Sequence, residues 1–155
     1  MRFLLADKSH IPELVRMRLE YVECDDGYIS DENRVKMSEA LPVYFEKHLG
    51  KDLMAFIAVE DDKVVATAFL LVIEKPSSPH FIHGKTGNAL NVYTQKAYQK
   101  QGIATKLMEM LIDYAKKECL DFIELKATEE GYPLYEKCGF TEEKQLYRNM
   151  KYIVH

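Results

Sequence analysis

Long apolar runs are missing from this sequence. The N-terminal apolar run, Phe3 to Ala6, is too short for the core of a signal peptide. Nothing elsewhere approaches the roughly 18 apolar residues that mark a membrane-spanning helix. We therefore expect no membrane partner and a cytoplasmic protein.

Cysteine is also scarce, with only three residues, Cys24, Cys119 and Cys138. An odd number at long, irregular spacing is not a disulfide framework, and no CxxC pair indicates zinc. Free thiols suit the reducing cytosol. His80 and His83 lie three residues apart, but no third ligand of the expected kind is near them, so we expect no metal.

A basic excess is absent as well. Lys and Arg number 21 against 25 Asp and Glu, for a formal net charge of -4. This balance gives no electrostatic reason to expect nucleic acid as a partner, and it would weakly attract a cationic small molecule. Hydrophobic residues make up 47% and charged residues 30% of the chain, an ordinary globular composition. The 155 residues suit a single domain, 1–155.

Apolar periodicity and turn residues predict an alternation of strands and helices. Residues 103–118 carry the clearest helical spacing, and 60–63 form a polar turn between two strand-like runs. Pro42 is expected to break or kink a helix. The full expectation is strands at 2–6, 53–59, 64–73, 88–94 and 121–127 with one or two more in 140–153, helices at about 9–22, 32–49, 103–118 and 131–137, and loops at 23–31 and 75–87. This order predicts an α/β (α+β) layer fold around a mostly antiparallel sheet.

The turn before the best helix is suited to phosphate. A strand ends near Thr94, and a polar loop leads through Gly102 into the helix. The first N–H groups of a helix have no internal partner, and the macrodipole adds partial positive charge there. A pyrophosphate is a natural ligand of such a turn. The loop matches neither GxxxxGK[ST] nor GxGxxG.

Two motifs connect this turn to a family. Residues 99–104, QKQGIA, match the pattern [Q/R]-x-x-G-x-[G/A], and residues 134–140, LYEKCGF, follow at the usual distance. Both resemble motifs of the GNAT family of N-acetyltransferases, and the element order is similar over nearly the whole chain. The resemblance implies the GNAT-like acyl-CoA N-acyltransferase fold, with acetyl-CoA as co-substrate and a primary amine as acceptor.

The resemblance also implies roles for individual residues. The pantetheine arm would lie between two splayed strands, and the pyrophosphate would lie on the loop and the start of the helix. Tyr135 matches the tyrosine that protonates the departing thiolate; a phenol pKa of about 10 lies close to the thiol's 8.5. An N–H near Val92 would stabilise the oxyanion. The residues expected to bind acetyl-CoA are Val92, Tyr93, Thr94, Gln99, Lys100, Gln101, Gly102, Ile103, Ala104, Thr105, Thr128 and Tyr135.

The sequence departs from the family pattern in three places. Gln99 replaces the commoner arginine, and Thr128 replaces an asparagine. Residues 89–91 offer no glutamate to act as the base. The base is therefore left open among Glu20, Asp25, Asp26 and a water molecule. Relatives build the acceptor pocket from this helix–loop–helix region, which places the acceptor near Glu20, Asp25, Asp26 and Asn91, although a solvated acidic loop explains the same acidic residues.

Several other functions fit the sequence. The acyl group could differ from acetyl, and the acceptor could be a protein N-terminus or a lysine. The chain could be a catalytically silent CoA-binding regulatory domain, or a nucleotide-binding module that uses the phosphate turn alone. Relatives often pair through sheet edges or last strands, which leaves a homodimer open.

Overall fold

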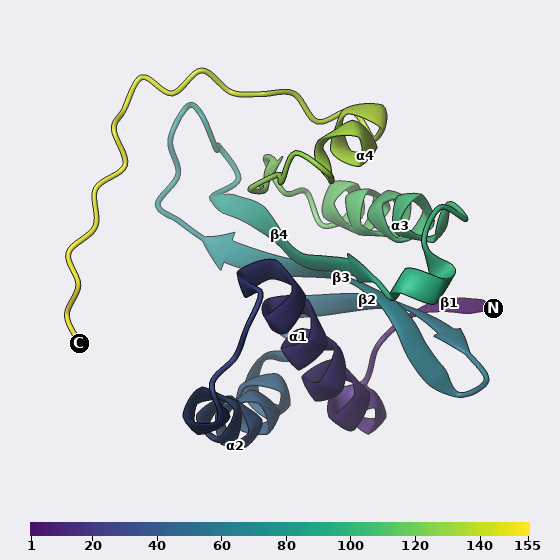
Figure 1. Ribbon diagram of the computed structural model, residues 1–155. Helices are drawn as coiled ribbons and strands as arrows, with labels where there is room; N and C mark the ends of the chain where they lie inside the picture. Colours follow the sequence, from purple (N-terminus) through teal and green to yellow (C-terminus); the bar gives the residue numbers. More distant parts are fainter.

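The computed structural model describes residues 1–155, which form one five-stranded sheet with helices on both faces (Figure 1). Short 3-10 turns precede α1 and α3. The elements in chain order are β1 (Arg2–Leu5), α1 (Ile11–Asp26), α2 (Asp31–His48), β2 (Leu53–Glu60), β3 (Lys63–Glu74), β4 (Lys85–Thr94), α3 (Ile103–Lys117), β5 (Ile123–Glu124) and α4 (Tyr132–Lys137).

The strands lie in the order β1-β2-β3-β4-β5. Strands β1 to β4 pair antiparallel with one another, and β5 pairs parallel to β4. Parallel neighbours need a crossover, and α3 supplies it. The prediction of a mostly antiparallel mixed sheet flanked by helices is confirmed.

The β2–β3 hairpin is also confirmed. Its turn consists of Asp61 and Asp62, whose φ angles are 50° and 61°, and Glu60 pairs with Lys63 across it. Two central residues with positive φ make the turn whose twist matches that of antiparallel strands, and aspartate tolerates this conformation.

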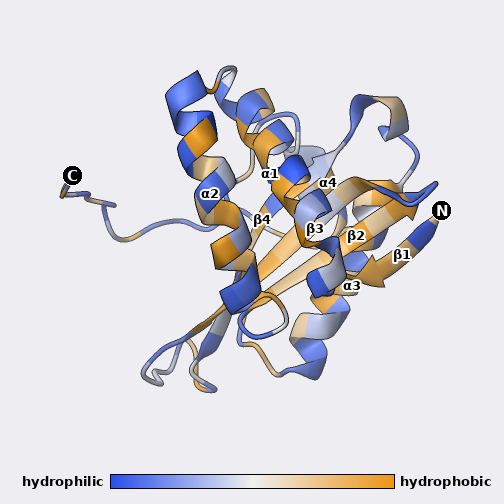
Figure 2. Cartoon of the chain, turned by 90° about the horizontal axis from the view of Figure 1, so that it is seen from below, coloured by the Kyte–Doolittle hydropathy of each residue, from blue (hydrophilic) through white to orange (hydrophobic).

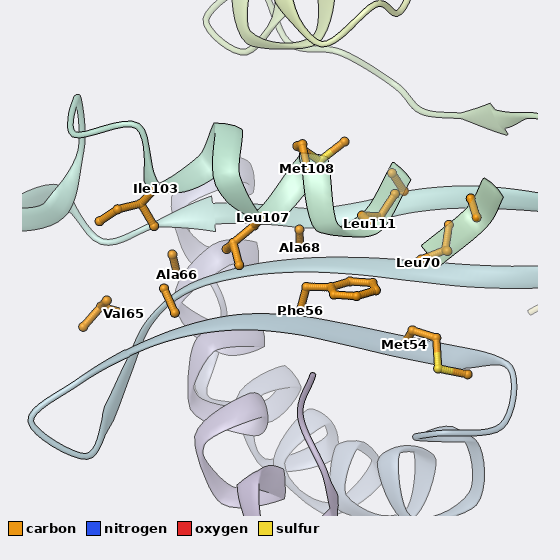
Figure 3. Packing of buried hydrophobic residues seen from close by; sticks show 13 residues of the cluster. Met54, Phe56, Val65, Ala66, Ala68, Leu70, Ile103, Leu107, Met108 and Leu111 are labelled. Carbon is orange, nitrogen blue, oxygen red and sulfur yellow. The ribbon is translucent and has the colours of Figure 1, made fainter. Parts of the chain in front are cut away.

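The two faces of the sheet carry separate hydrophobic cores. On one face, Ile103, Leu107 and Leu111 of α3 point toward β2 and β3, where they meet side chains such as Phe56 and Ala68 (Figure 3). Each fully buried leucine contributes about 2 kcal/mol by leaving water. The central strands are apolar along their length, whereas the helices alternate apolar and polar residues (Figure 2). Both faces of β2 and β3 are therefore covered.

The second core joins α1 and α2 to the opposite face. Leu14 and Met17 of α1 and Phe45 of α2 pack there against Ile57 and Phe69. The ring of Phe45 meets that of Phe69 edge to face at 5.9 Å. Figure 1 shows α1 and α2 on the side of the sheet opposite α3.

Several predicted boundaries are wrong. No strand forms in 140–153; from Thr141 on the chain is an extended tail that leaves the body and pairs with no strand (Figures 1 and 2). A strand needs a partner for its backbone groups, and the tail has none here. The expected strand 121–127 pairs only at Ile123–Glu124. Helix α2 continues through Pro42, and β4 begins three residues earlier than expected, at Lys85.

The predicted loop 23–31 is shorter than expected. Helix α1 continues to Asp26 and ends at Gly27, whose φ of 81° is the left-handed cap that glycine favours. Ser30 then caps α2 by accepting a hydrogen bond from the Asn33 N–H. None of the helices combines the length and apolar character that crossing a membrane would take.

Candidate active site

The turn between β4 and α3 presents a row of unpaired backbone donors. Lys100 and Gly102 have φ angles of 61° and 78°, so left-handed residues alternate with others along the loop. The N–H groups of residues 100–105 donate no hydrogen bond within the protein. Alternating conformations of this kind turn successive N–H groups into one concavity that suits an anion, and the α3 macrodipole reinforces it. The turn therefore fits a pyrophosphate.

A pocket opens where β4 and β5 separate. The two strands pair only at Gly87–Ile123 and Asn88–Glu124. Beyond these pairs, residues 92–94 of β4 and the segment after β5 form opposite walls. The pocket is lined by Tyr21, Cys24, Asp25, Val92, Tyr93, Thr94, Gln99, Ala104, Lys126, Thr128, Glu130, Gly131, Leu134 and Tyr135. One continuous surface thus leads from the phosphate turn to Tyr135.

Tyr135 is held at the end of this pocket by close packing. A Cβ on Gly131 would come within 3.1 Å of the Tyr135 ring, so the absence of a side chain there admits the tyrosine. Phe140 packs edge to face on the same ring at 6.1 Å. Burial, with smaller effects of Tyr21 and Cys138, raises the pKa of Tyr135 to about 12. The phenol is therefore protonated at neutral pH, and it is a weaker acid than an ordinary tyrosine.

Two threonines differ in how their hydroxyls are used. The Thr94 hydroxyl is buried at the pocket wall and has no hydrogen-bond partner in the protein. The Thr128 hydroxyl accepts a hydrogen bond from the Gly131 N–H at 3.1 Å, which ties down the start of α4. The Gln99 side chain donates to the Thr94 carbonyl at 3.0 Å, so it closes the turn on itself. An unpartnered hydroxyl beside unpaired amides favours a polar ligand in this pocket.

The acidic residues of α1 have different surroundings. Glu20 accepts hydrogen bonds from Arg16 at 2.8 Å and from Gln95 at 3.1 Å. Asp25 lines the pocket and pairs with no cation. Asp26 ends the helix without a partner. Of the three acidic candidates, the structure therefore brings only Asp25 to the pocket wall.

Asn91 lies behind the pocket. Its side chain is only 1% exposed and bonds to Thr67 and Arg18. Its neighbour Val92 forms part of the pocket wall.

Sequence reasoning missed several of the residues that form this pocket. Tyr21 and Cys24 come from α1, and the ring of Tyr21 meets that of Tyr93 edge to face at 6.1 Å. Lys126 comes from the opposite wall. The three-residue spacing of Tyr21 and Cys24 puts both side chains on one face of the helix. It does not tell whether that face is turned toward the pocket. His83, in the loop before β4, pairs with Asp121 at 2.7 Å and is not among the residues that line the pocket.

Known proteins share both the sequence pattern and the fold. The model of the acetyltransferase (GNAT) family matches residues 18–140, and the chain belongs to this family. It is therefore an acyltransferase enzyme. No curated protein matches it in sequence.

Solved structures agree with this assignment. A predicted acetyltransferase with acetyl-CoA from Clostridium acetobutylicum is 28% identical, with a TM-score of 0.84 over 97% of this chain and 95% of that one. A GCN5-related N-acetyltransferase from Ralstonia eutropha is 20% identical, with a TM-score of 0.78 over 96% and 97%. A glucosamine-6-phosphate N-acetyltransferase from Arabidopsis thaliana is 20% identical, with a TM-score of 0.65 over 98% and 99%. The last two show the fold alone.

Proposed function

We propose that this chain, as a single domain over 1–155, transfers an acetyl group from acetyl-CoA to a primary amine by direct attack in a ternary complex. The observation that carries the proposal is the row of unpaired N–H groups in residues 100–105, which opens into a pocket ending at Tyr135. The similarity to the Clostridium protein, whose structure contains acetyl-CoA, supports the choice of co-substrate.

Acetyl-CoA would lie along this surface. Its pyrophosphate would accept hydrogen bonds from Lys100, Gln101, Gly102, Ile103, Ala104 and Thr105. Its pantetheine arm would run between the two pocket walls, against main-chain groups of Val92, Tyr93 and Thr94, with Gln99 and Thr128 at its sides. This places the thioester near Tyr135, because that residue lies at the end of the pocket away from the phosphate turn.

The chemistry requires three groups. A neutral amine attacks the thioester carbonyl, and a main-chain N–H at Val92 stabilises the oxyanion, an effect of about 3–4 kcal/mol for one such donor. The C–S bond then breaks, and the departing thiolate takes a proton from the Tyr135 hydroxyl or is stabilised by a hydrogen bond from it. The attacking nitrogen loses its extra proton as the amide forms, and this proton restores the Tyr135 phenol or passes to the thiolate. Since its pKa is near 12, Tyr135 is present as the donor form throughout the physiological range.

The acceptor would enter from the α1 side. Its ammonium form must lose a proton before attack, and we propose that Asp25 receives this proton directly or through water. Glu20 is held by Arg16 and Gln95, so it contributes negative charge rather than a free base. Asp26 adds negative charge to the same end of α1. Together these carboxylates favour a cationic amine over an anionic acceptor.

Several alternative acceptors and functions are compatible with this fold. Structural relatives act on acceptors as different as a ribosomal protein and a sugar phosphate, so the fold does not select an acceptor. A protein N-terminus, a lysine or a larger acyl group stays a rival. A silent CoA-binding domain is the second candidate, because residues 89–91 carry no glutamate.

We also propose a cytoplasmic protein that forms a homodimer, uses no metal and binds neither nucleic acid nor membrane.

Two measurements test the function. Calorimetry with acetyl-CoA and with free CoA should give micromolar binding of both. Release of CoA thiol should then be followed with a panel of polyamines, amino-acid amides and peptides with free N-termini. We expect turnover with at least one amine. Binding without turnover on any amine would favour the silent domain, and no binding would refute both.

A further inference from the structure

Asn91 is a buried polar residue in a conformation that most residues avoid. Its φ is 52°, in the left-handed region, although it lies within β4. Its side chain is 1% exposed. Asparagine tolerates left-handed geometry better than other residues with a side chain, but burying an amide costs free energy unless its polar atoms are paired.

Three hydrogen bonds pair those polar atoms. The Asn91 Nδ2 donates to the Thr67 Oγ1 at 3.0 Å, and the Thr67 hydroxyl donates to the Asn91 carbonyl oxygen at 2.7 Å. Nη1 of Arg18, on α1, donates to the Asn91 Oδ1 at 3.0 Å. Thr67 itself is 1% exposed. Side chains from α1 and β3 thus hold one residue of β4 by both its amide and its main chain.

This residue forms a β-bulge. Thr67 pairs with Tyr93, whereas Phe69 pairs with Leu90, so one residue of β3 faces two of β4. Because of the bulge, the side chains after Asn91 lie on the opposite face of the sheet from the one they would have in a regular strand. Leu90 packs in the α1–α2 core, and Val92 packs on the α3 side. Two residues that would share a face in a regular strand lie on opposite faces here.

Arg18 is suited to hold this bulge without an ion pair. It is half-buried, and no carboxylate lies within 4 Å of it. Its guanidinium lies 5.8 Å from the centre of the Tyr21 ring. Arg16, two residues earlier on α1, bonds Glu13 and Glu20 instead. The Asn91 amide is therefore the acceptor that fixes Arg18, and Arg18 fixes the amide.

We infer that Arg18, Asn91 and Thr67 are positioning residues: their hydrogen bonds hold the β4 bulge and so fix the main chain at Val92, which the proposed function already uses as the oxyanion donor. This inference rests on the proposed acetyl transfer. A regular strand here would need no buried amide, no left-handed residue and no guanidinium held without a carboxylate. The arrangement therefore fixes the position of the β4 main chain after Asn91, and it is not needed for the pairing of the sheet.

The test compares two buried threonines. Thr67→Val removes the hydroxyl that bridges Asn91. Thr86→Val is the matched control, because Thr86 is also fully buried, lies in β4 and has a hydroxyl with no partner. The readouts are kcat with the amine that the wild type uses best and the Kd of acetyl-CoA by calorimetry. Thr67→Ser, which keeps the hydroxyl, tests for rescue.

We expect Thr67→Val to lower kcat about tenfold or more, because an oxyanion donor is displaced, while the Kd changes less than about twofold. Thr67→Ser should restore most of the rate, and Thr86→Val should behave as the wild type. Asn91→Gly, which adopts the same φ without strain but lacks the amide, should resemble Thr67→Val. Equal kcat in the two valine variants would overturn the inference, as would a parallel loss of kcat and affinity.

A wild type that acetylates no amine would count against the proposed function and still leave the bulge open to test. In that case the backbone ¹⁵N amide signals of Asn91 and Val92 are the readout. Thr67→Val should shift them, and Thr86→Val should leave them in place. Signals that stay unmoved in Thr67→Val would refute the positioning role.

Discussion

At the scale of the single residue, Tyr135 is the group whose loss should separate chemistry from binding. Tyr135→Phe keeps the ring that packs on Phe140 and removes only the hydroxyl. We expect kcat to fall about 10²-fold, a typical effect of losing a general acid, with acetyl-CoA affinity changed less than about twofold. Steady-state kinetics and calorimetry on the same preparation measure both. Equal losses of rate and affinity would show that Tyr135 only shapes the pocket.

The raised pKa of Tyr135 gives a second prediction for the same side chain. Burial favours the neutral phenol, so the folded state should hold this proton up to pH about 12, whereas the unfolded chain releases it near pH 10. The folded state binds more protons between these values, so stability falls as pH rises through this window. The difference in tyrosinate absorbance at 295 nm between wild type and Tyr135→Phe should show a midpoint near pH 12. A difference complete by pH 10.5 would contradict the buried state.

At the scale of the element, the turn at the start of α3 depends on Gly102. Its φ is 78°, and a Cβ there would meet no atom within 4 Å. Gly102→Ala should therefore cost about 1 kcal/mol of backbone strain and also place a methyl group where the phosphates approach. We expect acetyl-CoA affinity to fall about tenfold, measured by calorimetry.

Gly50→Ala is the control for this substitution. Gly50 has a φ of 80° and equally open surroundings, but it lies in the turn after α2. Thermal unfolding should report a similar loss of stability in both variants, and acetyl-CoA affinity should fall only in Gly102→Ala. Equal affinities would mean that the turn does not contact the phosphates.

The elements also show what the sequence could and could not predict. Spacing alone located α3, because this helix buries a periodic apolar face, and two apolar runs around a short polar turn located the β2–β3 hairpin. The family motifs pointed to the turn at Gly102. The bulge at Asn91 was not predicted, because its hydrogen bonds come from Thr67 and Arg18, which lie far from it in sequence. One or two final strands were predicted in 140–153, but a strand forms only beside a neighbour, and local sequence does not identify that neighbour.

At the scale of the whole molecule, the pocket lies where three separate parts of the chain meet. Helix α1 supplies Tyr21 and Asp25, β4 supplies Val92, and the region around α4 supplies Tyr135. The two hydrophobic cores hold these parts on opposite sides of the sheet. Co-substrate and acceptor can thus approach from different sides, which suits transfer in a ternary complex.

The C-terminal tail, from Thr141 on, pairs with no strand of its own chain and exposes several large apolar side chains. Met150 and Tyr152 are 94% and 89% exposed, and with Val154 they alternate as in a strand with one apolar face. The sheet ends at β5, whose outer edge has no partner. An exposed edge and an apolar strand-like segment in the same chain favour pairing between two copies. We therefore expect light scattering after size exclusion to give about 36 kDa, twice the 18.0 kDa of one chain.

Paired variants test whether the apolar face of the tail makes this contact. Met150→Glu with Tyr152→Glu places two charges on that face and should give a monomer of 18.0 kDa. Gln145→Glu with Asn149→Glu adds the same charge at polar positions of the tail and should stay dimeric. A wild type that is monomeric at every concentration would refute the homodimer. If both double variants remain dimeric, the copies pair through another surface. The outer edges of β1 and β5 are then the next places to introduce charge, because these two edge strands carry the unpaired backbone groups of the sheet.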